Sequence, residues 1–219
     1  MPLTQFVNKH AGCTAWVFGK GPSVDQYLTS LEHLDSHTKD SVLIAINEAV
    51  LVVRDPDYFF CHDGPVLERC VDPWNHGFKQ GRADVDDRIS LVYPHECTAI
   101  LRHEHEGLYQ GLDAHYYTKA QQEATLLSLS PEKLAETGKL YGESSTTQSA
   151  CHFAKLIGAA RVVLVGIDGG EGIAEVFKGI EPIKGYWYTK NRGDTRRILE
   201  AMGMPYEVWE PEHAKATDI

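Results

Sequence analysis

The chain has 219 residues, of which 42% are hydrophobic, so it is long enough to bury the core of one large domain. Its formal net charge of −10 argues against a nucleic-acid-binding protein, which usually carries a basic face, without excluding one. No apolar run approaches the roughly 20 residues that cross a bilayer, so no membrane span is predicted. The N-terminal residues do not read as a signal peptide, and five cysteines without a CxxC pair indicate free thiols, so we expect a cytoplasmic protein.

Short β-branched runs alternate with helical stretches along the chain. The predicted strands are residues 14–19, 41–47, 57–62, 89–94, 114–118, 161–168 and 205–210. Helices are predicted at 23–34, 145–158 and 193–203, where apolar residues recur at helical spacing. Several strands are continuously apolar, as strands covered on both faces are. The alternation predicts a single α/β domain over residues 1–219. Its Rossmann-like sheet would be mostly parallel and doubly wound, with helices on both faces.

The stretch from 72 to 122 fits this pattern less well, because it is rich in polar and aromatic residues and has weak periodicity. We interpret it as an irregular insertion or lid. His103, His105 and His115 lie in it, but Glu104 and Glu106 alternate with the first two. An exposed polar segment is therefore favoured over a metal site, and no metal ligand is assigned.

A glycine-rich turn connects the first predicted strand to the first predicted helix. Gly19 and Gly21 can adopt positive φ and let a ligand approach the backbone closely. Ser23 and Gln26 have the spacing of a capping box, so Ser23 is expected to cap the helix, whose start would favour a phosphate. The turn lacks the Walker A ending and the third glycine of the dinucleotide fingerprint, and a tight turn without a ligand is the alternative. The predicted nucleotide-binding residues here are Gly19, Lys20, Gly21, Pro22 and Ser23.

A second helix start follows the same logic. The run from 144 to 149 is rich in hydroxyl groups, and Ser145 and Gln148 again have capping-box spacing. The helix leads to the apolar strand that ends at Asp168, whose carboxylate suits a hydroxyl or metal ligand, or forms an Asx-turn. The predicted nucleotide-binding residues in this part are Ser145, Thr146, Thr147, Gly166 and Asp168.

Two more strand ends carry polar residues. Asn47 ends the second predicted strand, where its amide could bind a ribose or a base edge, or cap the helix that follows. His62 and Asp63 end the third strand, at the edge of the sheet where ligands bind. The alternative, which the residue type favours, is that His62 is a histidine packed and hydrogen-bonded at a strand end.

The order of these motifs resembles a known family. G-x-G-P-S follows the first strand, Asn47 closes the second, Asp63 follows the third, and a Ser/Thr-rich helix leads into "LVGID". This order resembles glycosyltransferase family 42, the bacterial sialyltransferases that use CMP-activated sialic acid. It is also similar to domain of unknown function 115, which includes flagellin-glycosylation proteins and archaeal 6-hydroxymethylpterin diphosphokinases. The resemblance spans residues 17 to about 209.

The resemblance implies roles for several residues. Gly19, Gly21, Ser23 and Asn47 would contact the nucleotide, the helix start at 145–147 would lie near it, and Asp168 would close the site. The sialyltransferases carry a catalytic histidine before their last basic helix. Tyr188 stands at that position here, so the general base of the family is not carried over.

Glycosyl transfer needs a base for the acceptor and groups that stabilise the leaving phosphate. His62 suits the first task because its ordinary pKa is about 6.5. The candidate catalytic residues are His62, Asp63, Asp168 and Tyr188. The candidate phosphate or acceptor contacts are Tyr186, Lys190 and Arg192, in or beside the only dense basic cluster, residues 189–197.

Three functions stay open at this point. The first is a nucleotide-sugar-dependent glycosyltransferase without a required cofactor, acting on an unidentified acceptor. The second is a diphosphokinase of the 6-hydroxymethylpterin type, which uses ATP and Mg²⁺ held by Asp63 and Asp168. The third is a nucleotide-binding protein without catalysis, consistent with the missing histidine. A homo-oligomer is compatible with all three.

Overall fold

The computed structural model describes residues 3–29, 40–71, 97–106, 112–168, 172–177 and 186–210, with side chains for all of these except 186–189. The strands are β1 (Thr14–Phe18), β2 (Ser41–Ile46), β3 (Tyr58–Cys61), β4 (Thr98–Arg102), β5 (Ala114–Ala120), β6 (Lys139–Tyr141), β7 (Arg161–Val165) and β8 (Tyr206–Val208). The α-helices are α1 (Ser23–Thr29), α2 (Gly64–Val71), α3 (Pro131–Thr137), α4 (Thr146–Leu156) and α5 (Tyr186–Ala201). Short 3-10 helices are η1 (Thr4–Phe6), η4 (Asn47–Leu51), η5 (His103–His105), η6 (Ala124–Ser128) and η7 (Glu175–Phe177).

The strands form one sheet in the order β6-β5-β4-β3-β2-β1-β7-β8, and every neighbouring pair is parallel. From β1 to β6 the chain adds strands in one direction. It then returns through α4 and places β7 on the other side of β1. The strand order therefore reverses between β1 and β7, and ligands of doubly wound sheets bind beyond the carboxyl ends of the strands at such a reversal. The predicted α/β class and parallel sheet are confirmed.

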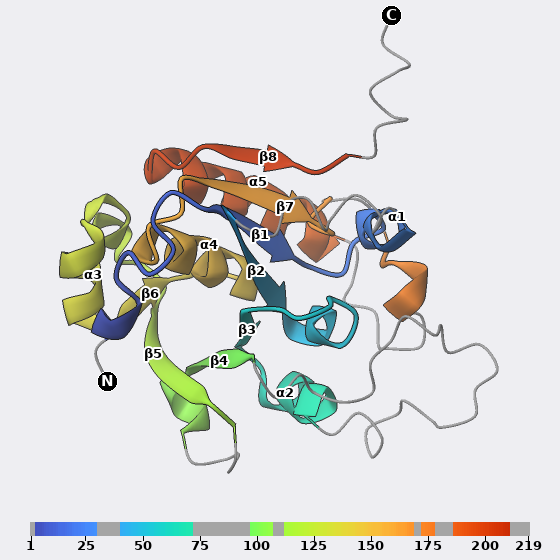
Figure 1. Ribbon diagram of the computed structural model, residues 1–219, viewed down its shortest axis with the longest axis horizontal. Coiled ribbons are helices and arrows are strands. Elements are labelled where there is room, and N and C mark those ends of the chain that lie inside the picture. Colours follow the sequence, from blue (N-terminus) through green and yellow to red (C-terminus); the bar gives the residue numbers. More distant parts are fainter. Residues whose placement is uncertain are drawn as a thin grey trace, which may run out of the picture.

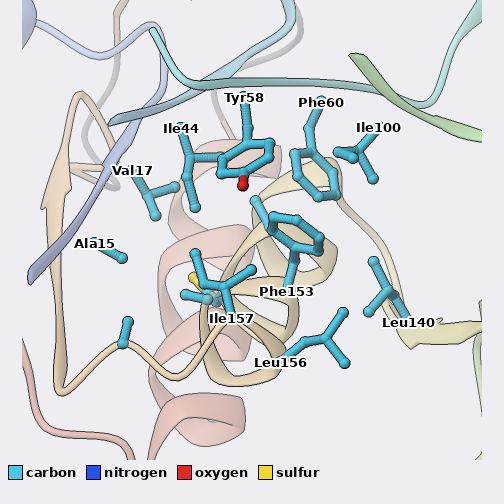
Figure 2. Close-up of a cluster of buried hydrophobic side chains, with 14 of the residues drawn as sticks. Ala15, Val17, Ile44, Tyr58, Phe60, Ile100, Leu140, Phe153, Leu156 and Ile157 are labelled. Atoms are coloured by element: carbon cyan, nitrogen blue, oxygen red, sulfur yellow. The ribbon is translucent and has the colours of Figure 1, made fainter. Parts of the chain in front are cut away.

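Helices cover both faces of the sheet. Helices α3, α4 and α5 lie on one face, and α1 and α2 lie on the other (Figure 1), each over its own buried apolar cluster. Helix α4 is the central element of the first cluster, because it contacts β1, β2 and β3. Figure 2 shows Phe153 of α4 against Tyr58 and Phe60 of β3, with ring centroids 4.9 and 5.2 Å apart. This packing fixes the start of α4 at the carboxyl edge of the sheet.

Some predicted boundaries were wrong. β4 lies inside the stretch from 72 to 122 that the sequence pattern left irregular, and β6, α2 and α3 were not predicted either. The last long helix begins at Tyr186 instead of residue 193, so the aromatic and basic residues before Gly193 are helical. The strand predicted at 89–94 lies outside the described residues. Among the described helices, none is both long and apolar enough to cross a membrane.

Candidate functional site

A cavity of about 220 Å³ opens at the carboxyl edge of the sheet. The ends of β1, β2, β3, β4, β5 and β7 border it, together with the start of α4 and one residue of α5. Twelve of the predicted site residues line it: Gly19, Lys20, Gly21, Pro22, Asn47, His62, Asp63, Ser145, Thr146, Thr147, Gly166 and Asp168. The lining residues that were not predicted are Ile46, Arg102, Lys119, Ser144, Ile167, Gly172 and Asn191.

The turns that follow β1 and β7 pack directly on one another, and we call residues 19–23 and 166–168 the β1–β7 seam. Gly19 N–H donates to the Val165 carbonyl (2.8 Å), and Gly21 N–H donates to the Gly166 carbonyl (2.7 Å). A Cβ at Gly19 would lie 2.6 Å from the Gly166 carbonyl oxygen, and one at Gly21 would also meet the Asp168 carboxylate. Neither Gly19 nor Gly21 has a positive φ. The two glycines therefore do not use the positive φ that is open to them, and the close neighbour that excludes a side chain is the protein's own backbone.

Asp168 is bound to the start of α1. The Ser23 hydroxyl donates to one carboxylate oxygen (2.5 Å), and the Ser23 N–H donates to the other (3.0 Å). The same hydroxyl accepts a hydrogen bond from Gly166 N–H at 2.8 Å. Ser23 is the first residue of α1, and its hydroxyl is committed to the seam, so the predicted capping box with Gln26 was wrong. Because its two oxygens already accept hydrogen bonds, Asp168 is poorly placed as a general base.

Lys20 belongs to a buried ion network. Its ammonium lies 2.7 Å from a carboxylate oxygen of Glu48, which is fully buried, and Arg69 of α2 lies 2.9 Å from the other oxygen. Burial alone would raise the pKa of Glu48, but Lys20 and Arg69 outweigh it and hold the pKa below its ordinary value. Lys20 thus lines the pocket while paired with Glu48, a carboxylate that it shares with Arg69.

Asn47 follows β2 directly with φ of 55°, a strained value for a residue other than glycine. Its side-chain oxygen is buried, and no donor among the described residues reaches it. Such an acceptor is costly to leave unpaired. An N–H or O–H of a ligand in the pocket would satisfy it.

His62 is buried at the end of β3. Its Nε2 is hydrogen-bonded to the Tyr117 hydroxyl, and its carbonyl accepts a hydrogen bond from His105 Nε2 at 2.8 Å. Burial lowers the pKa of His62 to about 2, and the positive charges of Lys119 and Arg102 add to this. The ring is therefore neutral at pH 7 and weakly basic. The expectation of an ordinary pKa was wrong, which removes the reason for choosing His62 as the base.

Asp63 is the next residue, and it differs from His62 in its exposure and in the hydrogen bonds of its side chain. It is exposed and lines the pocket. Its backbone carbonyl accepts hydrogen bonds from the first turn of α2, at Val66 and Leu67. In the described part of the chain, no group donates a hydrogen bond to its carboxylate. Asp63 is thus a free carboxylate on a fixed backbone.

Lys119 and Arg102 bring positive charge to the opposite end of the pocket from α1. Lys119 is near the end of β5, and Arg102 is the last residue of β4. Burial lowers the pKa of Lys119, and the neighbouring charge of Arg102 lowers it further. No sequence pattern indicated either residue, because β4 was not recognised and β5 was predicted to stop at residue 118.

The start of α4 supplies hydroxyl and N–H groups. Ser145 precedes the helix but its hydroxyl donates to the Asn191 side-chain oxygen (2.5 Å), so it caps no helical N–H. Gln148 accepts a hydrogen bond from Ser144 N–H (2.9 Å), one residue earlier than the predicted capping box requires. The predicted pairing of Ser145 with Gln148 was wrong. The first N–H groups of α4 have no acceptor within the helix, and Thr146 and Thr147 line the pocket.

The predicted phosphate contacts on α5 are less clearly part of the site. Arg192 donates from Nη1 to the Asp168 carbonyl and so ties α5 to the β1–β7 seam. Lys190 is exposed, lies 4.0 Å from Asp194, and does not line the pocket. Tyr186 and Tyr188 are in the first turn of α5, and their side chains lie outside the described residues.

Comparison with known proteins supports the fold. No family model matches the chain, and neither does any curated protein sequence. A solved structure of the MAf glycosyltransferase from Magnetospirillum magneticum AMB-1 is similar, with a TM-score of 0.55 and 13% sequence identity. The similarity covers 92% of this chain and 34% of that one, so this chain spans about a third of the neighbour's length. At this identity the likeness shows the fold alone.

Proposed function

We propose that the chain is a nucleotide-sugar-dependent glycosyltransferase. The observation that carries the proposal is one cavity in which a free carboxylate, Asp63, and several positive groups lie together at a strand reversal of a parallel sheet. The positive groups are Arg102, Lys119 and the start of α4. A base beside an anion-binding region is what transfer from a phosphate leaving group needs. The similar structure is itself a glycosyltransferase, which supports the choice.

In the proposed step the acceptor hydroxyl oxygen attacks the anomeric carbon of the donor sugar. The bond from that carbon to the phosphate oxygen breaks, and its electron pair leaves with the nucleotide. Asp63 takes the hydroxyl proton, and the positive groups stabilise the charge that develops on the leaving phosphate. Asn47 would accept a hydrogen bond from the ribose or base of the donor, because its buried oxygen has no other partner in the described residues.

The cavity volume agrees with partial enclosure of the donor. Sites that bury a whole drug-sized ligand usually measure about 300–1,000 Å³. A cavity of about 220 Å³ is smaller, so it would hold the phosphate and the adjoining sugars, and the acceptor would approach from the open side, where Asp63 is exposed.

The diphosphokinase alternative depends on more carboxylates in the pocket than glycosyl transfer does. It needs carboxylates to hold Mg²⁺ between the phosphates of ATP. Asp63 is free, but both oxygens of Asp168 accept hydrogen bonds from Ser23. Asp63 is thus the one carboxylate of this pair without a hydrogen bond from the described residues, and glycosyl transfer, which needs a single base, requires no second one.

The test is donor turnover by Asp63→Asn. Radiolabelled CMP-, UDP- and GDP-sugars are incubated with the protein, and release of the sugar to water or to an added acceptor is measured with and without EDTA. ATP with Mg²⁺ is the diphosphokinase arm. We expect Asp63→Asn to lower turnover by about 10²–10⁴-fold, because proton transfer typically contributes that much. Donor binding, measured as the rise in Tm, should persist.

Glu68→Gln is the matched control, because Glu68 is an exposed carboxylate on α2 that does not line the pocket. It should turn over the donor like the wild type. Equal activity of Asp63→Asn and wild type would contradict the role of Asp63. Stabilisation by nucleotides without turnover of any donor would favour the non-catalytic alternative.

A further inference from the structure

We propose that the donor is a nucleoside diphosphate sugar, with one phosphate held by Lys119 and Arg102 and the other by the adjacent start of α4. The identification of the ligand as a sugar donor rests on the proposed function. The binding site for two neighbouring phosphates can be tested by itself, without turnover.

Lys119 is the centre of the site. It is partly buried beside the pocket, and no carboxylate among the described residues forms an ion pair with it. Asp63 and Glu104 act on it only at longer range, and their effect is smaller than that of burial and of Arg102. A partly buried ammonium that lies beside a guanidinium and has no ion-pair partner of its own is in an unfavourable arrangement, which an anion in the pocket would relieve.

Arg102 has N–H groups that its contacts with His62 and Glu104 do not use. Its Nη1 donates to the His62 carbonyl (3.5 Å), and its Nη2 donates to the exposed carboxylate of Glu104 (2.5 Å). A guanidinium carries five N–H donors in a fixed fork that suits phosphate oxygens. The contact to His62 fixes Arg102 at the cavity and leaves the remaining donors for a ligand.

Lys119 lies against the segment that leads into α4. Gly142 N–H donates to the Ala120 carbonyl (3.0 Å), which joins this segment to the end of β5. A Cβ at Gly142 would lie 3.5 Å from Lys119 Cε and also 3.5 Å from the Ser145 carbonyl oxygen. The Lys119 side chain therefore runs beside the helix start, and the two positive elements are neighbours. The two phosphates of a diphosphate share one bridging oxygen. They therefore lie close enough together for one to bind Lys119 and the other to bind the start of α4.

The charge count separates the donor classes. A nucleoside monophosphate sugar has one negative charge on its phosphodiester, whereas a nucleoside diphosphate sugar has two. Lys119, the N–H donors of Arg102 that His62 and Glu104 leave free, and the start of α4 offer contacts to both phosphates, and the leaving diphosphate gains one more negative charge when the sugar departs. A monophosphate donor reaches the same charge only if its sugar is an acid, so this is the competing assignment.

The experiment is calorimetric titration in EDTA of matched pairs: CMP and CDP, UMP and UDP, GMP and GDP, AMP and ADP. We expect at least one diphosphate to bind about 10-fold or more tightly than its monophosphate, as one added charge-assisted contact allows. Lys119→Met should abolish this preference and leave monophosphate binding nearly unchanged. Lys119→Arg, which keeps the charge, should retain part of the preference.

Lys133→Met is the matched control, because Lys133 is an exposed lysine of α3 outside the pocket. Far-ultraviolet circular dichroism and Tm confirm that each variant is folded. Equal affinity for mono- and diphosphates in the wild type would overturn the inference, as would an equal loss of both in Lys119→Met. So would a Lys119→Met effect confined to a CMP-linked sugar acid.

The failure of this inference is distinguishable from the failure of the proposed function. Turnover of a monophosphate-linked donor with no diphosphate preference would keep glycosyl transfer and overturn the diphosphate assignment. A Lys119-dependent diphosphate preference without turnover of any sugar donor would keep the site and overturn transfer. Binding of no nucleotide at all would overturn both.

Discussion

The two ends of the pocket are built differently. In the β1–β7 seam the polar groups are satisfied within the protein: Asp168, Ser23 and Gly166 bond to one another, and no buried side-chain atom of the seam is unpartnered in the described part of the chain. At the other end, Lys119 lies beside the start of α4 with no ion-pair partner among the described residues, and the neighbouring Arg102 pairs with the exposed Glu104. The difference indicates that the seam holds the fold together, and it is the reason why we propose that the ligand's phosphates bind at the end of Lys119 and Arg102.

Gly21→Ala should have the largest effect on stability. Its new Cβ would meet the Asp168 carboxylate and lie 2.8 Å from the Gly166 carbonyl oxygen, and neither is the free end of a flexible side chain. We expect a loss of about 2–3 kcal/mol in the free energy of unfolding, measured in urea. Gly193→Ala in α5 is the control, because nothing lies within 4 Å of its Cβ position. It should stabilise by about 0.5–1 kcal/mol, since alanine favours the helix. An unchanged free energy of unfolding in Gly21→Ala would contradict the close packing that we describe for the seam.

Ser23→Ala should come next. It removes the hydroxyl that joins Gly166 N–H to the Asp168 carboxylate, and it leaves a buried N–H without an acceptor. We expect a loss of about 1–3 kcal/mol in unfolding free energy. Combined with Asp168→Asn, the two losses should be less than additive, because both changes break the same bonds. Additive losses in this double-mutant cycle would show that the two residues act separately.

His62 should make the stability depend on pH. Its pKa is about 2 in the folded protein, against an ordinary value of 6.5, so between these values the unfolded chain binds a proton that the folded chain does not. Its contribution is therefore complete above pH 6.5 and is lost as pH falls, with a slope approaching ~1.4 kcal/mol per pH unit. His62→Gln should reduce the slope measured by urea unfolding between pH 4.5 and 6.5.

The exposed His103 provides the control for this experiment, because it lies at the surface beside Glu106. His103→Gln should leave the slope of unfolding free energy against pH close to that of the wild type. An unchanged slope in His62→Gln would mean that the His62 ring takes up protons in the folded protein.

The smallest expected effect has the opposite sign. Burial and Arg102 disfavour the charge of Lys119 in the free protein, so Lys119→Met should raise the unfolding free energy, by about 0.5 kcal/mol. The same variant should weaken diphosphate binding. A loss of stability in Gly21→Ala together with a gain in Lys119→Met would support the difference between the two ends of the pocket. A clear loss of stability in Lys119→Met would contradict it.

Much of the fold could be predicted because it depends on local patterns. Continuously apolar runs such as 41–46 and 161–165 identified buried parallel strands, and the polar residues at their ends located the pocket. Helix α3 was also predictable in principle, because Ser130, Pro131 and Gly138 are its start and stop signals. β6 has three residues, which is too short for a periodic pattern.

The site itself depends on contacts that sequence spacing does not reveal. The glycine-rich turn looks like a ligand loop, but its glycines are required by a turn some 145 residues later in the chain. The pKa of His62 is lowered by its burial and, in addition, by the charges of Lys119 and Arg102, which come from two other strands. Such long-range charges and close backbone contacts become visible only when the strands are aligned.

The most direct measurement is a backbone-amide NMR titration of the isotope-labelled protein with inorganic pyrophosphate in EDTA, which probes the pocket without depending on the base or the sugar. We expect saturable shifts that are largest at Thr146, Thr147 and Lys119, that are lost in Lys119→Met and are kept in Lys133→Met. Shifts confined to the seam at residues 19–23, or no saturable shifts at all, would contradict the claim that the cationic end holds the phosphates.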